Sequence, residues 1–237
     1  MDALLILLCL IPSLLILVYV YVKDKIEKEP FSLLMLLFIG GVIAFVISFF
    51  ISIVLKETIP FLKLNYMSMN ILQIIFKFLI VISFVEECTK WIFTYITVWE
   101  NKNFNYMYDS IVYSVFTSLG FATIENIFYG LSFSSYGLFP IIIRGLCSVP
   151  SHAVFGIFMG YYLGVSKHAF YQKKNYNKYK FLSLIVPVLL HFFYNLLLIK
   201  SSTIYYFIFV IYIIILYIFA FFKIKKISLL SKKITKK

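Results

Sequence analysis

The sequence predicts an all-α fold, namely a polytopic bundle of about seven transmembrane helices with the N-terminus outside the cell and the C-terminus in the cytoplasm. The first reason is composition: of 237 residues, 62% are hydrophobic and only 14% are charged, whereas about 25% are charged in soluble domains. The second is a series of apolar runs of about 20 residues, the length that a helix needs to cross a bilayer core. The third is an imbalance of lysines between alternate connections. A water-soluble fold is therefore excluded.

The apolar runs and the polar residues between them divide the chain into seven expected spans. The first run follows Met1 and Asp2 without a basic segment or a cleavage signal, so we expect a retained helix rather than a signal peptide. Residues 1–222 are expected to form one transmembrane helical domain, and residues 223–237 a basic cytoplasmic tail that contacts anionic membrane lipids. The spans are 3–22, 31–54, 76–98, 110–132, 139–165, 181–199 and 203–222.

Two of these spans carry further local signals. Asp109 stands at the start of the fourth span and is expected to be its N-cap. In the fifth span, Gly156, Gly160 and Gly164 follow His152 at intervals of four residues. Small residues at this spacing are typical of closely packed membrane helices, so His152 is expected on the protein-facing side of its helix.

The lysines predict the orientation of the chain. One set of alternate connections and the tail carry sixteen lysines and the other set carries three, which by the positive-inside rule places the first set in the cytoplasm. The net charge of +12 is explained by this bias and by anionic lipid, so no nucleic-acid partner is expected. The sixteen lie at 23–28, 102, 167–180 and 223–237, and the three are Lys56, Lys63 and Lys200.

Seven ionisable residues fall inside the expected spans. A lipid-facing Glu, Lys or Arg near the bilayer centre costs about 2.5–3.5 kcal/mol, so these groups must face one another or a wet cavity. Counted from the outer end of each span, four of them lie roughly 10–20 Å deep. We therefore expect a single site in the outer half of the membrane. The seven are Glu86, Glu87, Lys90, Glu125, Arg144, His152 and His191, and the four are Glu86, Glu125, His152 and His191.

Local spacing suggests how these groups interact. Lys90 follows Glu86 by four residues and Glu87 by three, so it can pair with either carboxylate. The two glutamates point about 100° apart, so one is expected to face the reacting centre and the other a supporting partner.

Three further polar residues belong to the expected site, Asn195 as a catalytic residue and Arg144 and Asn126 in support. Asn195 lies one turn after His191, on the same helix face, and offers a neutral amide donor. Arg144 either extends to the membrane interface or neutralises the acidic cluster. Asn126 is expected to bridge helices by hydrogen bonds.

Buried carboxylates and histidines can activate water against an amide bond, with imidazole or amide groups binding a metal or the developing oxyanion. Membrane proteolysis is therefore the favoured function. A paired-aspartate site is excluded because the only aspartates are Asp2, Asp24 and Asp109, and the chain has neither HExxH nor Gly-x-Ser-Gly. A proton- or cation-coupled transporter remains an alternative, because buried Glu, His and Lys also form proton relays. Cys9, Cys88 and Cys147 are expected to be packed thiols.

Four motifs in order resemble the PrsW family of membrane proteases, which is related to the CAAX-processing and bacteriocin-immunity superfamily. FVEECTK at 84–90 is similar to the family motif EExxK, and FATIEN at 121–126 is similar to FxxxE. SHAVFG at 151–156 is similar to HxxxG, and HFFYN at 191–195 is similar to HxxxN.

The resemblance implies a multi-pass protease domain in a bacterial cytoplasmic membrane. Such an enzyme would make the first cut in a single-pass anti-sigma factor, on its extracytoplasmic side, and so activate a sigma factor under envelope or antimicrobial-peptide stress. A non-proteolytic immunity or scaffold member of the same superfamily is the other possibility that the resemblance leaves open.

The resemblance also assigns functional residues. It implies Glu86, Glu87, Glu125, His152 and His191 as the functional set. The CAAX relatives carry His where this chain has Glu125. Two mechanisms remain open: a zinc ion held by His152, His191 and Glu125, which would form a His2Glu set, and a metal-free glutamate mechanism.

Overall fold

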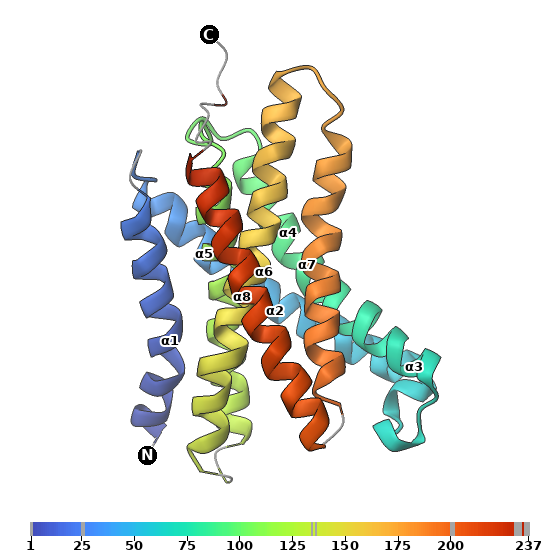
Figure 1. Ribbon diagram of the computed structural model, residues 1–237. Coiled ribbons are helices and arrows are strands. Elements are labelled where there is room, and N and C mark those ends of the chain that lie inside the picture. The colour runs from blue at the N-terminus through green and yellow to red at the C-terminus, as the bar shows by residue number, and fades with distance from the viewer. Residues whose placement is uncertain are drawn as a thin grey trace.

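The computed structural model (Figure 1) describes residues 2–24, 27–133, 135, 137–199, 202–229 and 234. Within this part of the chain every regular element is helical, which confirms the predicted all-α class. The long helices are α1 (Asp2–Lys23), α2 (Phe31–Thr58), α5 (Asp109–Ser132), α6 (Phe139–Tyr171), α7 (Asn177–Leu197) and α8 (Thr203–Leu229). The shorter elements are η1 (Pro60–Lys63), η2 (Tyr66–Ser68), α3 (Ile71–Phe76), the π-helix η3 (Lys77–Phe84) and α4 (Val85–Val98).

Six described helices, α1, α2 and α5 to α8, are long and apolar enough to cross a membrane, so the chain is a multi-pass membrane protein. The remaining predicted span, 76–98, lies in α3, η3 and α4, which follow one another without a break from Ile71 to Val98. Helix α6 continues to Tyr171 rather than ending at 165, and α8 continues to Leu229. The first seven residues of the predicted tail are therefore helical, and most of the remainder lies outside the described residues.

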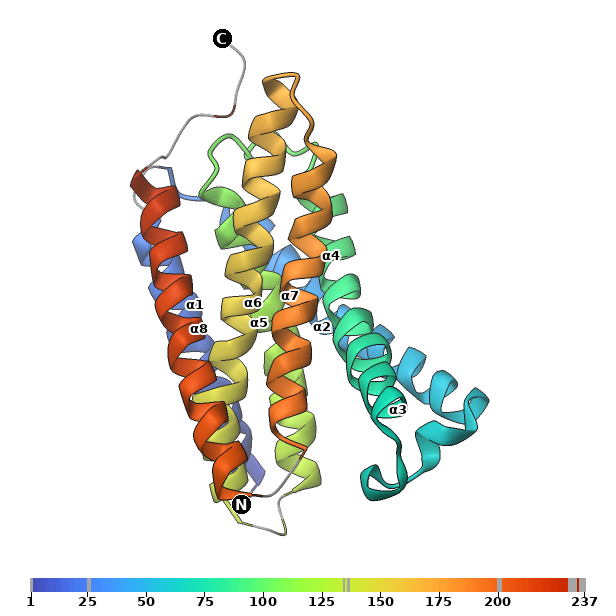
Figure 2. The same cartoon turned by 45° about the vertical axis from the view of Figure 1, so that its right-hand side comes forward.

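The start of α1 and the end of α8 lie at opposite ends of the bundle. Figures 1 and 2 show the start of α1 with the α5–α6 connection at one end, and the end of α8 with the α1–α2, α4–α5 and α6–α7 connections at the other. Among the described residues, the connections and helix ends that hold most of the sixteen lysines are thus gathered at one end of the molecule. Which end faces the cytoplasm stays a prediction from the positive-inside rule.

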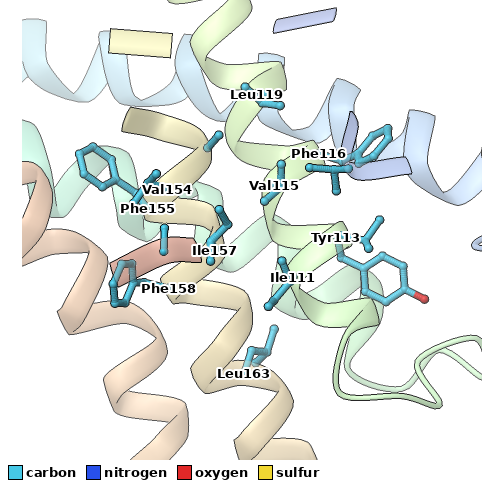
Figure 3. Close-up of a cluster of buried hydrophobic side chains, with 14 of the residues drawn as sticks. Ile111, Tyr113, Val115, Phe116, Leu119, Val154, Phe155, Ile157, Phe158 and Leu163 are labelled. Atoms are coloured by element: carbon cyan, nitrogen blue, oxygen red, sulfur yellow. The ribbon is translucent and has the colours of Figure 1, made fainter. Parts of the chain in front are cut away.

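Helix α5 is the centre of the bundle, because it packs against α6, α2 and α1 and is buried along most of its length. Its apolar side chains meet those of α6 in the core that Figure 3 shows, where Ile111 and Val115 lie near Ile157 and Leu163. The predicted small-residue stripe of α6 lies against α5: a Cβ added at Gly160 would stand 2.3 Å from the Ser110 carbonyl oxygen. The two backbones are therefore in direct contact, which is the packing that the glycine spacing predicted.

The interpretation of Asp109 as an N-cap is wrong. Its Oδ2 accepts hydrogen bonds from the backbone N–H groups of Asn105, at 2.9 Å, and Tyr106, at 2.7 Å. Both donors precede the helix, whereas an N-cap accepts from the second or third residue within it. The carboxylate therefore holds the α4–α5 connection in place.

We expect Gly160→Val to separate α5 from α6 and to lower the thermal stability of the detergent-purified protein. The added atoms would meet the Ser110 carbonyl and, at 2.5 Å, the Ile111 Cα, which are backbone atoms that cannot turn aside. Overpacking typically costs about 1–3 kcal/mol. Gly40→Ala is the control, because its new methyl group would meet only the movable Phe93 ring, at 3.2 Å. Equal midpoints for Gly160→Val and the wild type would contradict the packing argument.

Candidate functional site

Four helices bring the intramembrane ionisable residues together. Glu87 comes from α4, Glu125 from α5, His152 from α6 and His191 from α7. His152 Nε2 lies 3.0 Å from Glu125 Oε2, and His191 Nδ1 lies 2.9 Å from Glu87 Oε1. The two imidazole rings are 5.3 Å apart between centroids. Glu86 Oε2 lies 3.9 Å from His191 Nε2, so the four side chains that were predicted to share one depth, Glu86, Glu125, His152 and His191, belong to one cluster.

Glu87 and Lys90 form a buried ion pair behind the histidines. Lys90 Nζ donates to Glu87 Oε1 at 2.6 Å, and both side chains are fully inaccessible to solvent. Glu87 Oε1 also contacts His191, and Lys90 Nζ lies 3.1 Å from His152 Nδ1. The pair thus touches both histidines, and its first function is to hold them.

Glu86 faces the other way, into a cavity. Its side chain is 16% exposed, and its Oε2 is buried without a hydrogen-bond partner among the described residues. The nearest basic atom is His191 Nε2, 3.9 Å away. Of the two adjacent glutamates, Glu86 is therefore the one that faces the cavity, and Glu87 is the supporting partner.

The contacts of the two histidines set which ring nitrogen carries the hydrogen. The Glu87 carboxylate only accepts, so His191 donates from Nδ1, which in the neutral ring leaves the lone pair at Nε2. The Lys90 ammonium only donates, so His152 accepts at Nδ1 and its Nε2–H donates to Glu125. The anionic Glu87 thus holds His191, and the cationic Lys90 holds His152. As a result, neutral His191 presents a lone pair at Nε2, whereas His152 presents an N–H there.

Arg144 neutralises the acidic cluster, which was one of its two expected roles. Its guanidinium forms an ion pair with Glu125 at 3.1 Å and stands 4.2 Å from the centre of the Tyr129 ring. Sequence reasoning did not single out Tyr129, although it lies one turn after Glu125 and so on the same helix face. Tyr129 lines the cavity beside both Glu86 and Glu125.

The two asparagines have different environments. Asn195 lines the cavity, and its Nδ2 is buried without a hydrogen-bond partner in the described part of the chain. Asn126 donates to the Cys9 carbonyl at 3.0 Å, and the Cys9 thiol donates to the Asn126 carbonyl at 3.5 Å. The expected bridging by Asn126 is confirmed, but it joins α5 to α1 and does not line the cavity.

The cavity between these helices has a volume of about 270 Å³. We call it the site cavity. It is large enough for several waters. Its polar lining includes Glu86, Glu125, Arg144, His152, His191 and Asn195.

These features define a polytopic helical membrane protein whose carboxylates and imidazoles are enclosed between α4, α5, α6 and α7. Residues 29–221 match the family described as PrsW family intramembrane metalloprotease, and the chain belongs to this family of membrane proteases.

Curated relatives agree with this assignment. The chain is similar to Protease PrsW of Oceanobacillus iheyensis, with 36% identity over 91% of this chain and 92% of that protein. It is also similar to Protease PrsW of Bacillus subtilis, with 35% identity over 82% of this chain and 83% of the relative. Protease PrsW of Clostridioides difficile has 35% identity over 81% of this chain and 78% of that relative. No solved structure matches the chain.

The family description implies a metal ion, and the residues present fit one. Two overlapping groups of potential ligands have their donor atoms within 4.8 Å of one another. Carboxylate oxygens and imidazole nitrogens are suitable zinc ligands, and a histidine ligand usually donates its other N–H to a buried acceptor, as His191 does to Glu87. His152 could bind a metal only by giving up its Nε2 hydrogen bond to Glu125. The groups are Glu87, His152 and His191, and Glu86, Glu125 and His152. The set expected from the sequence, Glu125, His152 and His191, is neither of these groups but shares two residues with each.

Proposed function

We propose that the protein is an endopeptidase that makes the first, extracytoplasmic cut in a single-pass anti-sigma factor and thereby starts sigma-factor activation under envelope or antimicrobial-peptide stress. The observation that carries the catalytic part is Glu86, which lines a cavity beside two imidazoles and whose Oε2 has no hydrogen-bond partner among the described residues. Membership of a membrane protease family supports peptide hydrolysis over ion-coupled transport. The anti-sigma substrate rests on the family resemblance of the four motifs.

In this mechanism Glu86 takes a proton from a water molecule in the site cavity as the water attacks the scissile carbonyl carbon. The carbonyl oxygen becomes an oxyanion, for which the Asn195 amide and the Arg144 guanidinium are available donors. When the carbon–nitrogen bond breaks, the protonated Glu86 gives its proton to the leaving amine. Glu87 and Lys90 take no proton and hold the imidazoles in position.

A zinc ion held by Glu125, His152 and His191 is part of the proposal. When bound, such an ion would supply Lewis-acid polarisation of the scissile carbonyl. We expect purified protein to contain about one equivalent of zinc, and His191→Gln to lower that content sharply. His168→Gln is the matched control, because His168 lies near the end of α6, where it contacts Gln172. Full activity in metal-free protein would instead support the glutamate mechanism.

The proposal is tested by co-expressing the protein with candidate single-pass anti-sigma factors. We expect wild type to yield a clipped substrate and the Glu86→Gln variant to leave it intact. A substrate that stays uncut but co-purifies with the wild type would support the scaffold alternative.

The extracytoplasmic position of the cut depends on the predicted orientation. In a variant without native cysteines, a probe confined to the cell exterior should label Ser135→Cys in the α5–α6 connection and miss Lys174→Cys in the α6–α7 connection. Both positions are exposed, so accessibility does not bias the comparison. The reverse labelling would show that the lysine-poor end faces the cytoplasm. It would contradict the proposal that the protein makes an extracytoplasmic first cut.

A further inference from the structure

A second and larger cavity leads to the site cavity. Its volume is about 590 Å³, and it shares Glu86 and Glu125 with the site cavity. It lies between the C-terminal half of α2, the connection with η1 and η2, the π-helix η3 and α5. Figure 2 shows α3 and the adjoining end of α2 diverging from the rest of the bundle. We call this cavity the access groove.

One part of the access groove is apolar. Phe45, Phe49 and Phe128 form a continuous aromatic surface, with ring centroids 5.1–6.1 Å apart. Val81 and Ile82 of η3 line another part. This surface can accept apolar side chains of a peptide, and Glu86 and Glu125 belong to the lining of the same groove.

The other part is basic. Lys56 of α2, Lys63 of η1 and Lys77 of η3 line the groove, and the only carboxylates among its described lining residues are Glu86 and Glu125. Lys63 pairs with Glu57 at 2.6 Å, and Lys77 stands 4.2 Å from the centre of the Tyr66 ring. Lys56 and Lys77 form no ion pair within the described residues.

The position of these lysines is unusual. Lys56 and Lys63 are two of the three lysines on the predicted outer side, where the positive-inside rule disfavours them. The orientation of the chain in the membrane therefore does not explain why basic residues occur in the groove. Binding of a negatively charged partner would explain them.

We propose that the access groove binds the substrate in an extended form and that Lys56 and Lys77 select a segment with acidic residues on the extracytoplasmic side of the scissile bond. This inference rests on the proposed function. A bound lipid headgroup would satisfy the lysines, but it would leave unexplained why the groove continues to Glu86.

The helical run gives a spacing. Lys77 and Glu86 are nine residues apart in one continuous helical segment, which would span roughly 13 Å as an α-helix at about 1.5 Å per residue. Residues 77–84 form the π-helix η3, which is wider and rises less per residue, so the axial distance is shorter than this. An extended peptide advances about 3.3 Å per residue. The preferred acidic residue should therefore lie within about four residues of the bond that is cut.

A binding experiment tests this inference without any cleavage. The full-length Glu86→Gln protein, in nanodiscs of phosphatidylcholine, is titrated with three fluorescent peptides that share a leucine–alanine segment and differ only in ending with two Glu, two Gln or two Lys. We expect the Glu peptide to bind roughly tenfold more tightly than the Gln peptide, as one or two charge-assisted hydrogen bonds allow. The Lys peptide should bind most weakly.

The preference should disappear with Lys56→Gln/Lys77→Gln and persist with Lys56→Arg/Lys77→Arg. Lys174→Gln, in the α6–α7 connection, is the control and should change nothing. Equal affinities for the three peptides would overturn the proposal. So would lysine-dependent binding of phosphatidylglycerol that displaces the Glu peptide, because the lysines would then belong to a lipid site.

The outcomes separate this inference from the proposed function. A charge preference without cleavage in the co-expression assay would support peptide binding in the access groove and contradict the proposed protease function. Cleavage without a charge preference would remove only the acidic selectivity.

Discussion

Glu86→Gln is expected to lower the rate of substrate cleavage about a thousandfold while the protein remains folded in the membrane, because removal of a general base typically costs between 10² and 10⁴. The substitution keeps the size of the side chain and removes its basicity. Folding should tolerate it, because Glu86 Oε2 has no hydrogen-bond partner in the described part of the chain. Cleavage of the co-expressed substrate and thermal unfolding of the purified protein are measured together.

The control for Glu86→Gln is Glu100→Gln, an exposed position in the α4–α5 connection that should leave cleavage unchanged. Full activity in Glu86→Gln, with activity lost in a stably folded Glu87→Gln protein, would transfer the role of general base to Glu87.

Lys90→Met is expected to lower the free energy of unfolding by about 3–5 kcal/mol, because it leaves the buried carboxylate of Glu87 without its cation. The double variant Glu87→Gln/Lys90→Met removes both charges and should recover much of this loss. Thermal unfolding in detergent micelles measures all three proteins. Cleavage should stay low in both variants, since the histidines lose the contacts that hold them.

The chain contains a matched exposed pair. Lys63 and Glu57 have the same 2.6 Å separation between Nζ and a carboxylate oxygen as Lys90 and Glu87, but their side chains are 48% and 65% exposed. Lys63→Met should therefore change stability little, because water screens the pair. Similar losses in Lys63→Met and Lys90→Met would show that burial does not set the cost.

Much of the site could be predicted because a charged side chain that faces lipid has a high free-energy cost. Ionisable side chains within apolar spans must find one another, so the clustering of Glu86, Glu125, His152 and His191 followed from depth alone. The glycine spacing of α6 predicted a close helix contact, and the structure identifies α5 as the partner. The close approach of α2 to α5 at Gly41 and Gly120 was not predicted, because neither glycine has another small residue four positions away in its own helix and the signal appears only when the helices are paired.

The sequence by itself determined the all-α class, the approximate spans and which polar residues must meet, because hydrophobic length and the cost of buried charge are properties of short segments. Only the tertiary structure decided that Glu86 faces the cavity while Glu87 holds Lys90 and His191, because the rotation of α4 is set by its packing partners. The access groove likewise depends on segments far apart in the chain, namely α2, η3 and α5. Lys56 and Lys77 both line the groove that opens where these helices diverge. No local sequence pattern determines the direction in which two helices separate.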